Sequence, residues 1–346
     1  MKPSSNPSRP RYVYESFAGK NKVFLWGTIV TGSDFWAFGV TLVLIHIPVI
    51  LFSIFVCPFV YNNISPAVVF VFAYIYLLCL FSLLKTSWTD PGILPRNLDP
   101  VEPMDTFGEP SGSSDMVDQS YFPLSAYPGL KDVVINGVAL KLKYCDTCQL
   151  YRPPRCSHCR QCDNCVENED HHCIWVNNCV GRRNYRYFFT FILTTSLLSL
   201  YVFGFSLGHL ILYWKKKMRE STSGMYSFQK ILGEAPISLV LVIYAFIFGF
   251  ALTALTIYHL CLISKNMTTH EQIRSSVNIR HVPHPFNLGN FVKNIIQFIA
   301  RPRPASYIEW RKLLEEERQS NKRQSITRVT PAPCIKTMSS RDHNPL

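Results

Sequence analysis

The sequence predicts an α-helical integral membrane protein with four transmembrane helices and a small cytosolic domain of short strands between the second and the third. Two observations support this class. Four long stretches of the 346-residue chain carry no charged residue, and a cysteine-dense segment separates the second stretch from the third. The uncharged stretches are Trp36–Val60, Pro66–Leu84, Tyr187–Trp214 and Ala235–Ile263.

Each stretch is long enough to cross a bilayer, because an α-helix needs about 20 residues to span a hydrocarbon core of roughly 30 Å. Buried helices of soluble proteins are usually shorter and carry polar faces, so we interpret all four as membrane spans. The histidines inside them, His46, His209 and His259, are interpreted as packed or interfacial side chains. A transporter or channel would require further ionisable residues within the spans, and the sequence has none.

The placement of Lys and Arg predicts which side of the membrane each loop occupies. Residues 1–34 are polar and lack the apolar region of a signal peptide, so the first span is expected to act as the targeting signal. Four spans put both ends of the chain on one side, and the uncharged link Tyr61–Ser65 is expected in the lumen. Lys215–Lys217 and Arg219 disagree with this orientation, which we keep because the cysteine chemistry below needs a reducing compartment.

The chain has a formal net charge of +12, which is expected mostly on the cytosolic side. Such a charge favours contact with anionic membrane lipids. Nucleic acid is not predicted as a partner, since no basic patch interleaved with aromatic residues occurs outside the segments that flank the spans.

Composition divides the chain into six regions. Asn97–Gly129 is rich in Pro, Ser, Gly and Asp and reads as a linker, whereas Val133–Tyr144 partly alternates and predicts short strands. Phe286–Ala300 predicts an amphipathic helix against the membrane or a packing partner, and the chain beyond Glu315 is expected to be disordered. We expect an N-terminal cytosolic segment (1–35), two spans (36–86), a linker (87–132), a cysteine-rich domain (133–186), two spans (187–263) and a cytosolic C-terminal segment (264–346).

The cysteine-rich segment predicts two metal sites. Eight of the twelve cysteines and three histidines lie between residues 145 and 179, a density that in the cytosol indicates metal rather than disulfides. The spacing C-x2-C-x9-H-x6-C occurs twice, offset by fourteen residues, and each set offers three thiolates and one imidazole, a closed tetrahedral shell for structural Zn²⁺. The two predicted sets are Cys145, Cys148, His158 and Cys165, and Cys159, Cys162, His172 and Cys179.

The repeat leaves Cys156, His171 and Cys173 outside the metal shells, because His172 and not His171 matches the register of His158. Cys156 has no acid or base beside it and is interpreted as a small buried residue. Cys173 follows Asp170 and His171, which supply an acid and a base for activating a thiol. A spare cysteine in a zinc module is the alternative on local chemistry alone.

The position of Cys173 favours the nucleophile. It precedes the third span by about fourteen residues, so its thiol is expected near the bilayer surface. A long-chain acyl-CoA suits such a place, because its thioester lies at headgroup level while its chain enters the membrane. Ordered zinc loops would preorganise the segment that carries the thiol.

Asp170-His171-His172-Cys173 within this frame resembles the DHHC protein S-acyltransferases (palmitoyltransferases). Asp90-Pro91-Gly92 after the second span and Thr268-Thr269-His270-Glu271 after the fourth match two further signatures of that family, and the similarity covers roughly Trp36–Ile296. More narrowly, Asp90–Asn97 and Lys141–Cys145 resemble the fungal endoplasmic-reticulum subunit that acts on Ras proteins.

The resemblance implies a two-step reaction in which Cys173 takes an acyl chain, such as palmitoyl, from acyl-CoA and passes it to a membrane-proximal protein cysteine. His171 is then the base and Asp170 orients it. It also implies protein substrates such as Ras-type GTPases, a small accessory subunit, and the endoplasmic reticulum, or the Golgi, as location.

The resemblance assigns supporting roles to four further residues. Thr269 is expected to contact the Asp170 region, and Glu271 to tie its motif to the zinc module. The tail motif of the family usually begins Asn-Pro-aromatic, whereas His284 precedes Pro285 here, so the family role at this place is assigned to Asn294. Asp90 is the fourth supporting residue.

A membrane-anchored ubiquitin ligase or another zinc interaction module is the alternative function. RING-type fingers also interleave two zinc sites, but His158 and Cys159 are adjacent here, which their spacing does not allow. Such a module would keep its function after Cys173→Ser.

Overall fold

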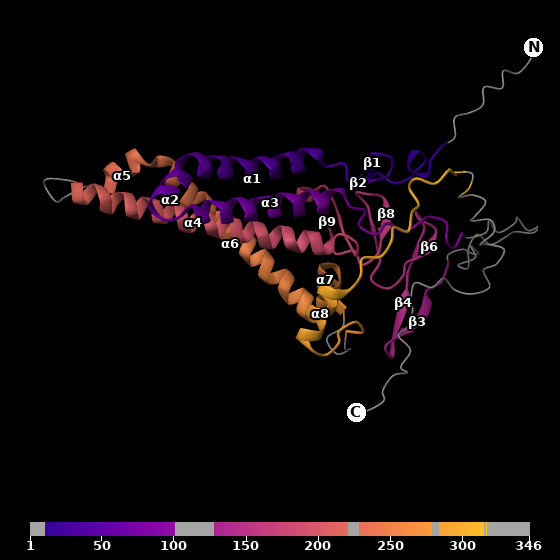
Figure 1. Cartoon of the computed structure of the whole chain (residues 1–346). Helices are drawn as coiled ribbons and strands as arrows, with labels where there is room; N and C mark the ends of the chain where they lie inside the picture. Colours follow the sequence, from indigo (N-terminus) through magenta and orange to yellow (C-terminus); the bar gives the residue numbers. More distant parts are fainter. Residues whose placement is uncertain (1–10, 101–127, 221–227, 279–283, 315, 317–346) are drawn as a thin grey trace, which may run out of the picture. The chain divides into compact units, whose positions relative to one another are not determined.

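The computed structural model describes residues 11–100, 128–220, 228–278, 284–314 and 316. Its four longest helices are apolar enough to cross a membrane, which confirms the predicted fold class. They run alongside one another in Figure 1, and α4 packs against both α3 and α6. Their bounds are α1 (Phe35–Phe55), α3 (Pro66–Trp88), α4 (Tyr185–Glu220) and α6 (Pro236–Lys265).

The first span ends earlier than the uncharged stretch Trp36–Val60 suggested. Helix α1 stops at Phe55, and a separate short helix, α2 (Cys57–Asn63), follows it. Pro58 lies in the first turn of α2, where its missing N–H leaves no unmade helical bond, whereas inside a continuous helix it would break one.

Apolar side chains cover the helices on every side. Inside, Phe52 of α1 and Val56, which lies between α1 and α2, pack with Phe72, Leu198 and Leu241 and are nearly inaccessible. Outside, large apolar side chains such as those of α3 and α6 remain exposed. A helix that is hydrophobic all round suits a lipid environment, where no polar face is needed.

Five antiparallel hairpins make up the described strands of the chain. One precedes α1, and the other four follow one another between α3 and α4, as the short-strand prediction required. The pairs are β1 (Lys22–Phe24) with β2 (Ile29–Thr31), β3 (Lys131–Ile135) with β4 (Val138–Leu142), β5 (Tyr144–Cys145) with β6 (Leu150–Tyr151), β7 (Ser157–Cys159) with β8 (Asn164–Val166), and β9 (His171–Cys173) with β10 (Asn178–Val180).

The segment after the fourth span forms two short helices, α7 (Thr269–Asn278) and α8 (Phe291–Ala300). The predicted amphipathic helix thus begins at Phe291 rather than Phe286. Asn290 caps it, since its side chain accepts hydrogen bonds from two backbone N–H groups of the first turn. The remaining elements are α5 (Phe228–Glu234) and the 3-10 turns η1 (Val13–Glu15) and η3 (Ile174–Val176).

The chain forms two compact units, Gly19–Tyr307 and the two terminal segments together. In the terminal unit, the backbone N–H of Val13 donates to Lys312, and the rings of Phe17 and Trp310 pack edge to face with centroids 4.9 Å apart. Most of the predicted linker Asn97–Gly129, the tail beyond Glu316 and Cys334 lie outside the described residues.

Candidate active site and metal clusters

Hairpin geometry brings each predicted metal set together. His158 lies opposite Cys165 in the β7–β8 pair, and His172 lies opposite Cys179 in the β9–β10 pair. The x6 spacer is therefore the length of the hairpin that turns the fourth ligand back beside the histidine. The first two cysteines of each set come from the preceding turn, and all four donor atoms lie within 4.8 Å of one another.

The donor spacing fits Zn²⁺. The Nδ1 atom of His158 lies 3.4–3.8 Å from the three sulfurs of its set, and Nδ1 of His172 lies 3.4–3.6 Å from those of the other. A tetrahedron with Zn–S of about 2.3 Å and Zn–N of about 2.05 Å has an S···N edge of about 3.6 Å. Both sets thus fit a closed shell that is typical of a structural metal.

Two carboxylates orient the ligand histidines, and sequence reasoning missed both. Asp34, just before α1, lies 2.9 Å from Nε2 of His172, and Asp163 lies 3.5 Å from Nε2 of His158. A carboxylate on the second ring nitrogen fixes the tautomer that leaves Nδ1 free for metal. No local signal points to Asp34, which lies 138 residues from His172.

Cys173 occupies the first position of a third, incomplete metal turn. It follows Cys145 and Cys159 at the same fourteen-residue interval, but Val176 stands where the second cysteine of the turn would be. The backbone repeats as well, because Gln149, Asp163 and Asn177 all adopt positive φ, at 48°, 54° and 51°. Loss of the partner cysteine leaves one thiol free in a rigid turn.

Asp170, His171 and Cys173 form a connected set. The Asp170 carboxylate, with a fully buried side chain, lies 2.7 Å from Nδ1 of His171. It also accepts hydrogen bonds of 2.8 Å from both the backbone N–H and the hydroxyl of Thr269. The acid is thus held on one side by α7 and presents its second oxygen to the histidine.

The charges of this set favour a thiolate beside an imidazolium. Burial opposes the charge on His171, but the bond to Asp170 and the neighbouring Cys173 outweigh it and raise the pKa of His171 to about 9. Burial alone would raise the pKa of Cys173, yet the His171 charge lowers it below its usual value. A lowered thiol pKa is what a nucleophilic cysteine requires.

The Thr-Thr-x-Glu segment clamps the metal-binding loop to the end of α6. Arg155 donates from Nε and Nη2 to the two oxygens of Glu271 at 2.9 and 2.8 Å, and it also donates to Asn266. Burial would raise the pKa of Glu271, but hydrogen bonds from His284 and the Arg155 charge lower it to about 2. The carboxylate is therefore ionised throughout the physiological range.

Asp90 and Asn294 each join separate segments. The Asp90 carboxylate accepts from the backbone N–H groups of Gly92 and Ile93 and lies 2.6 Å from the Arg183 guanidinium. The buried Asn294 side chain donates to the carbonyl of Ser264 at 2.8 Å, so α8 is tied to the end of α6. Both contacts are consistent with supporting roles, which remain predictions.

His259 lies closer to this set than its interpretation as a packed side chain suggested. Its Nδ1 is 3.0 Å from the Tyr185 hydroxyl, and its ring centroid is 6.1 Å from that of His171. By contrast, the contacts of His46 and His209 within the described part of the chain are with a backbone carbonyl, a serine hydroxyl and aromatic rings.

An apolar cavity of about 670 Å³ is lined by residues of α1, α4 and α6. His171, Cys173 and Trp175 also line it. Along α4 the lining runs from Phe188 to Val202, fourteen residues or about 21 Å of helix. A chain of methylene groups attached at the Cys173 sulfur would lie along this wall.

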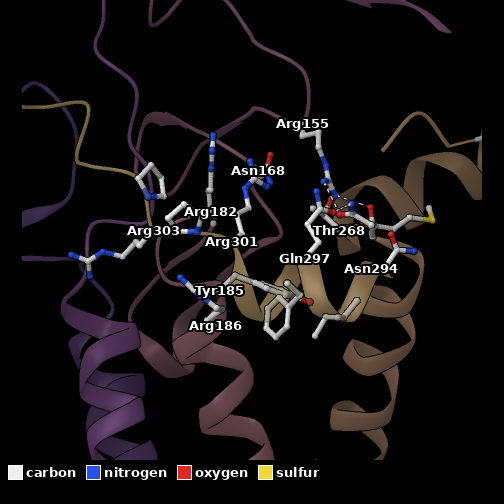
Figure 2. Close-up of a pocket in the computed structure, with 17 residues that line it drawn as sticks. Arg155, Asn168, Arg182, Tyr185, Arg186, Thr268, Asn294, Gln297, Arg301 and Arg303 are labelled. Carbon is white, nitrogen blue, oxygen red and sulfur yellow. Dashed lines mark hydrogen bonds between the residues drawn. The ribbon is translucent and has the colours of Figure 1, made fainter. Parts of the chain in front are cut away.

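A second pocket, of about 100 Å³, is lined by five arginines (Figure 2). Two of them have carboxylate partners, Arg155 with Glu271 and Arg182 with Glu167. The other three form no ion pair among the described residues. Arg186 donates to the carbonyl of Ile299 and Arg303 to the hydroxyl of Tyr187, while Arg301 lines the pocket beside them. The pocket thus offers an excess of positive charge to an anion.

Comparisons with known proteins identify the family of this chain. Residues 139–276 match the family model of the DHHC palmitoyltransferase. The palmitoyltransferase erf2 of Emericella nidulans is 38% identical over 88% of this chain and 49% of its own length, and the probable protein S-acyltransferase 7 of Arabidopsis thaliana is 40% identical over 88% and 66%. The palmitoyltransferase ZDHHC9 of Mus musculus is 36% identical over 95% of this chain and 87% of its own.

The chain spans about half the length of the Emericella relative, but most of the mouse one. The matched region contains both metal sets and the Asp170–Cys173 segment. With its four spans and its cysteine-rich loop, the chain belongs to the DHHC palmitoyltransferase family.

Proposed function

We propose that this protein is a protein S-palmitoyltransferase that accepts a long acyl chain from acyl-CoA on Cys173 and transfers it to cysteines of membrane-associated proteins. One observation carries the proposal. The thiol of Cys173, which belongs to neither metal set, lies beside the Asp170–His171 pair and lines an apolar cavity between the spans.

In the first step, the Cys173 thiolate attacks the thioester carbonyl of acyl-CoA. The new S–C bond forms as the bond to the CoA sulfur breaks, and the departing thiolate takes its proton from the His171 imidazolium. Asp170 holds the His171 ring and stabilises its charge, while Thr269 fixes Asp170.

In the second step, a substrate cysteine attacks the acyl-enzyme. Neutral His171 accepts the proton of the incoming thiol, the acyl group moves to the substrate sulfur, and the Cys173 thiolate is regenerated. The cavity holds the acyl chain between the steps and keeps the thioester near the membrane surface.

The two metal sets would hold structural Zn²⁺, whose binding supplies folding free energy to a loop with a small apolar core. Closed shells leave no position for substrate, so the chemistry belongs to the residues of the third, incomplete turn.

The arginine pocket is proposed as the site of the CoA phosphates. Guanidinium groups bind phosphate in two-pronged contacts, and three of the five form no ion pair among the described residues. Arg301→Glu is expected to raise KM for acyl-CoA with little change in kcat, and an unchanged KM would exclude this pocket as the phosphate site.

The partners and location implied by the resemblance extend the proposal. Substrates of the Ras-type GTPase class, a small accessory subunit, bound membrane lipids and residence in the endoplasmic reticulum or Golgi follow from similarity to the fungal enzymes. Both termini and the active site are proposed to face the cytosol, with the regional division given by composition.

Labelling of the purified protein tests the proposed activity. Incubation with radiolabelled palmitoyl-CoA should give an adduct that hydroxylamine removes and Cys173→Ser abolishes. Cys156→Ser is the matched control, because its thiol is buried and lies outside both metal sets. Labelling that survives Cys173→Ser would refute the mechanism, and full biological function of that variant would favour the zinc interaction module.

A further inference from the structure

The hairpin that precedes the first span has an apolar tip that nothing in the catalytic mechanism uses. Its four-residue loop, Leu25–Thr28, joins β1 to β2. Phe24, Leu25 and Trp26 are 47%, 59% and 71% exposed. Three consecutive large apolar side chains at the tip of a hairpin are unusual on a water-facing surface.

The backbone conformation of the tip does not favour large apolar residues. Leu25 and Trp26 adopt positive φ, at 47° and 52°, where bulky side chains are uncommon and Asn or Gly is preferred. The β3–β4 hairpin of the same chain has Asn136 and Gly137 in its turn, also at positive φ. The first hairpin thus carries large apolar groups at positions where turn stability alone would select small polar ones.

The tip is continuous with the start of a membrane span. The ring of Phe24 packs edge to face on that of Phe35, the first residue of α1, with centroids 6.4 Å apart. Phe35 and Trp36 are themselves 48% and 69% exposed. Figure 1 shows β1 and β2 beside this end of α1. Aromatic side chains at the end of a span are typical of the bilayer interface.

The base of the same hairpin is bound to the catalytic loop. The backbone N–H of Gly32 and the hydroxyl of Thr31 donate to the carbonyl of Asn177 at 2.6 and 2.9 Å. The Asn178 side chain donates to the carbonyl of Val30 at 2.9 Å. A Cβ at Gly32 would lie 2.9 Å from the Asn177 carbonyl oxygen, so this contact leaves no room for movement.

A second set of contacts ties the hairpin to the metal loop. The backbone N–H of Lys20 donates to the carbonyl of Cys162, and the side-chain amide of Asn164 donates to the side-chain oxygen of Asn21. Lys20 and Lys22 are exposed at the base of the hairpin, where Lys22 pairs with Thr31, and carry the positive charge that anionic headgroups attract.

We propose that the β1–β2 hairpin inserts Leu25 and Trp26 into the lipid interface beside α1 and thereby holds the Cys173 loop at a defined depth. The occupant of this surface is the headgroup and upper acyl region of the bilayer, because the tip continues the aromatic end of a span and two exposed lysines lie at the base of the same hairpin. Insertion depends on the membrane location alone, whereas its effect on acylation rests on the proposed function.

Insertion is tested by fluorescence of the full-length protein in nanodiscs of phosphatidylcholine and phosphatidylserine. Lipids brominated close to the headgroup quench a tryptophan at the interface. Wild-type protein should lose a larger share of its emission than Trp26→Phe, since Trp26 is one of six tryptophans. Equal quenching of the two proteins would overturn the proposal whether or not the protein is an acyltransferase.

The consequence for catalysis is tested with Leu25→Asn/Trp26→Asn, which suits the turn better but removes the apolar tip. In nanodiscs its acyl-enzyme formation should slow by about tenfold, as expected when two apolar side chains no longer favour the docked position. Its zinc content and melting temperature should match wild type. Val134→Asp, at a 72% exposed position of the other hairpin, is the control and should keep the wild-type rate.

The outcomes separate the possibilities. One possible result is that the double variant loses zinc while brominated lipids quench wild type and Trp26→Phe equally. That result would mean that the tip serves folding and not insertion. Protection of Trp26 by an added protein subunit in place of lipid would make the surface a protein interface. Either result overturns the proposal, while a normal rate with clear quenching would overturn its positioning role.

Discussion

Asp170→Asn isolates the charge that supports the proposed nucleophile. The side chain is fully buried and takes part in three contacts of 2.7–2.8 Å, two with Thr269 and one with His171. Asparagine has nearly the same shape and can still accept the backbone N–H of Thr269. The loss therefore falls mainly on the contact with His171, where an ion–imidazolium bond becomes a neutral one.

The magnitude follows from that single bond. A hydrogen bond to a charged group contributes about 1.5–3 kcal/mol, which corresponds to a rate of acyl-enzyme formation about 10- to 150-fold lower. Without the carboxylate, the pKa of His171 falls from about 9 and that of Cys173 rises, so less thiolate is present at neutral pH.

The rate of acyl-enzyme formation should depend on pH differently in wild type and in Asp170→Asn. Wild type keeps the ion pair from the lowered pKa of Cys173 up to about 9, so its rate changes little across neutral pH. In the variant, thiolate appears only as the pH approaches the ordinary thiol pKa of about 8.5, and the defect should be larger near neutrality than in mild alkali.

The assay is the initial rate of hydroxylamine-sensitive labelling by palmitoyl-CoA, with zinc content measured on the same samples. Glu169→Gln is a matched control, since this neighbouring carboxylate pairs with His270 and not with His171. A rate for Asp170→Asn within about twofold of wild type, with both metals retained, would remove Asp170 from the mechanism.

Three further predictions concern the scaffold. Cys148→Ser should lose zinc and the folded cysteine-rich loop, whereas Cys173→Ser should keep both; equal zinc loss would contradict the separation of metal and catalytic thiols. Gly181→Ala should lower the melting temperature sharply, because its Cβ would lie 2.7 Å from a backbone oxygen, whereas Gly208→Ala, with open space, should be neutral or stabilising. Arg155→Met should cost about 3–5 kcal/mol in unfolding measurements by removing the cation from its ion pair with Glu271, and a loss below about 1 kcal/mol would show that this clamp is dispensable.

Local features of the chain were sufficient to predict the spans and the metal ligands. Uncharged length alone indicates a membrane helix, and the x6 spacer between His158 and Cys165 already contains the hairpin that brings them together. The same fourteen-residue repeat also places Cys173 as the first residue of a turn that lacks its second cysteine. This relation is visible in the sequence, but the search for complete sets of four ligands does not detect it.

Helix ends were less predictable where hydrophobicity and backbone chemistry disagree. The uncharged stretch runs through Pro58 without a change in composition, yet α1 ends at Phe55. The amphipathic pattern likewise extends before Phe291, although Asn290 caps the helix there. Apolar periodicity reports the environment of a segment, while the last hydrogen bond of a helix depends on a single proline or cap.

Packing alone decided which distant groups complete the site. Asp34 reaches His172 across 138 residues, Thr269 reaches Asp170 across 99, and His259 enters from a span. A metal shell needs donors at fixed short spacing, which local sequence records. A polar group that orients such a shell needs only to lie nearby in space, so its identity follows from how the helices and hairpins pack.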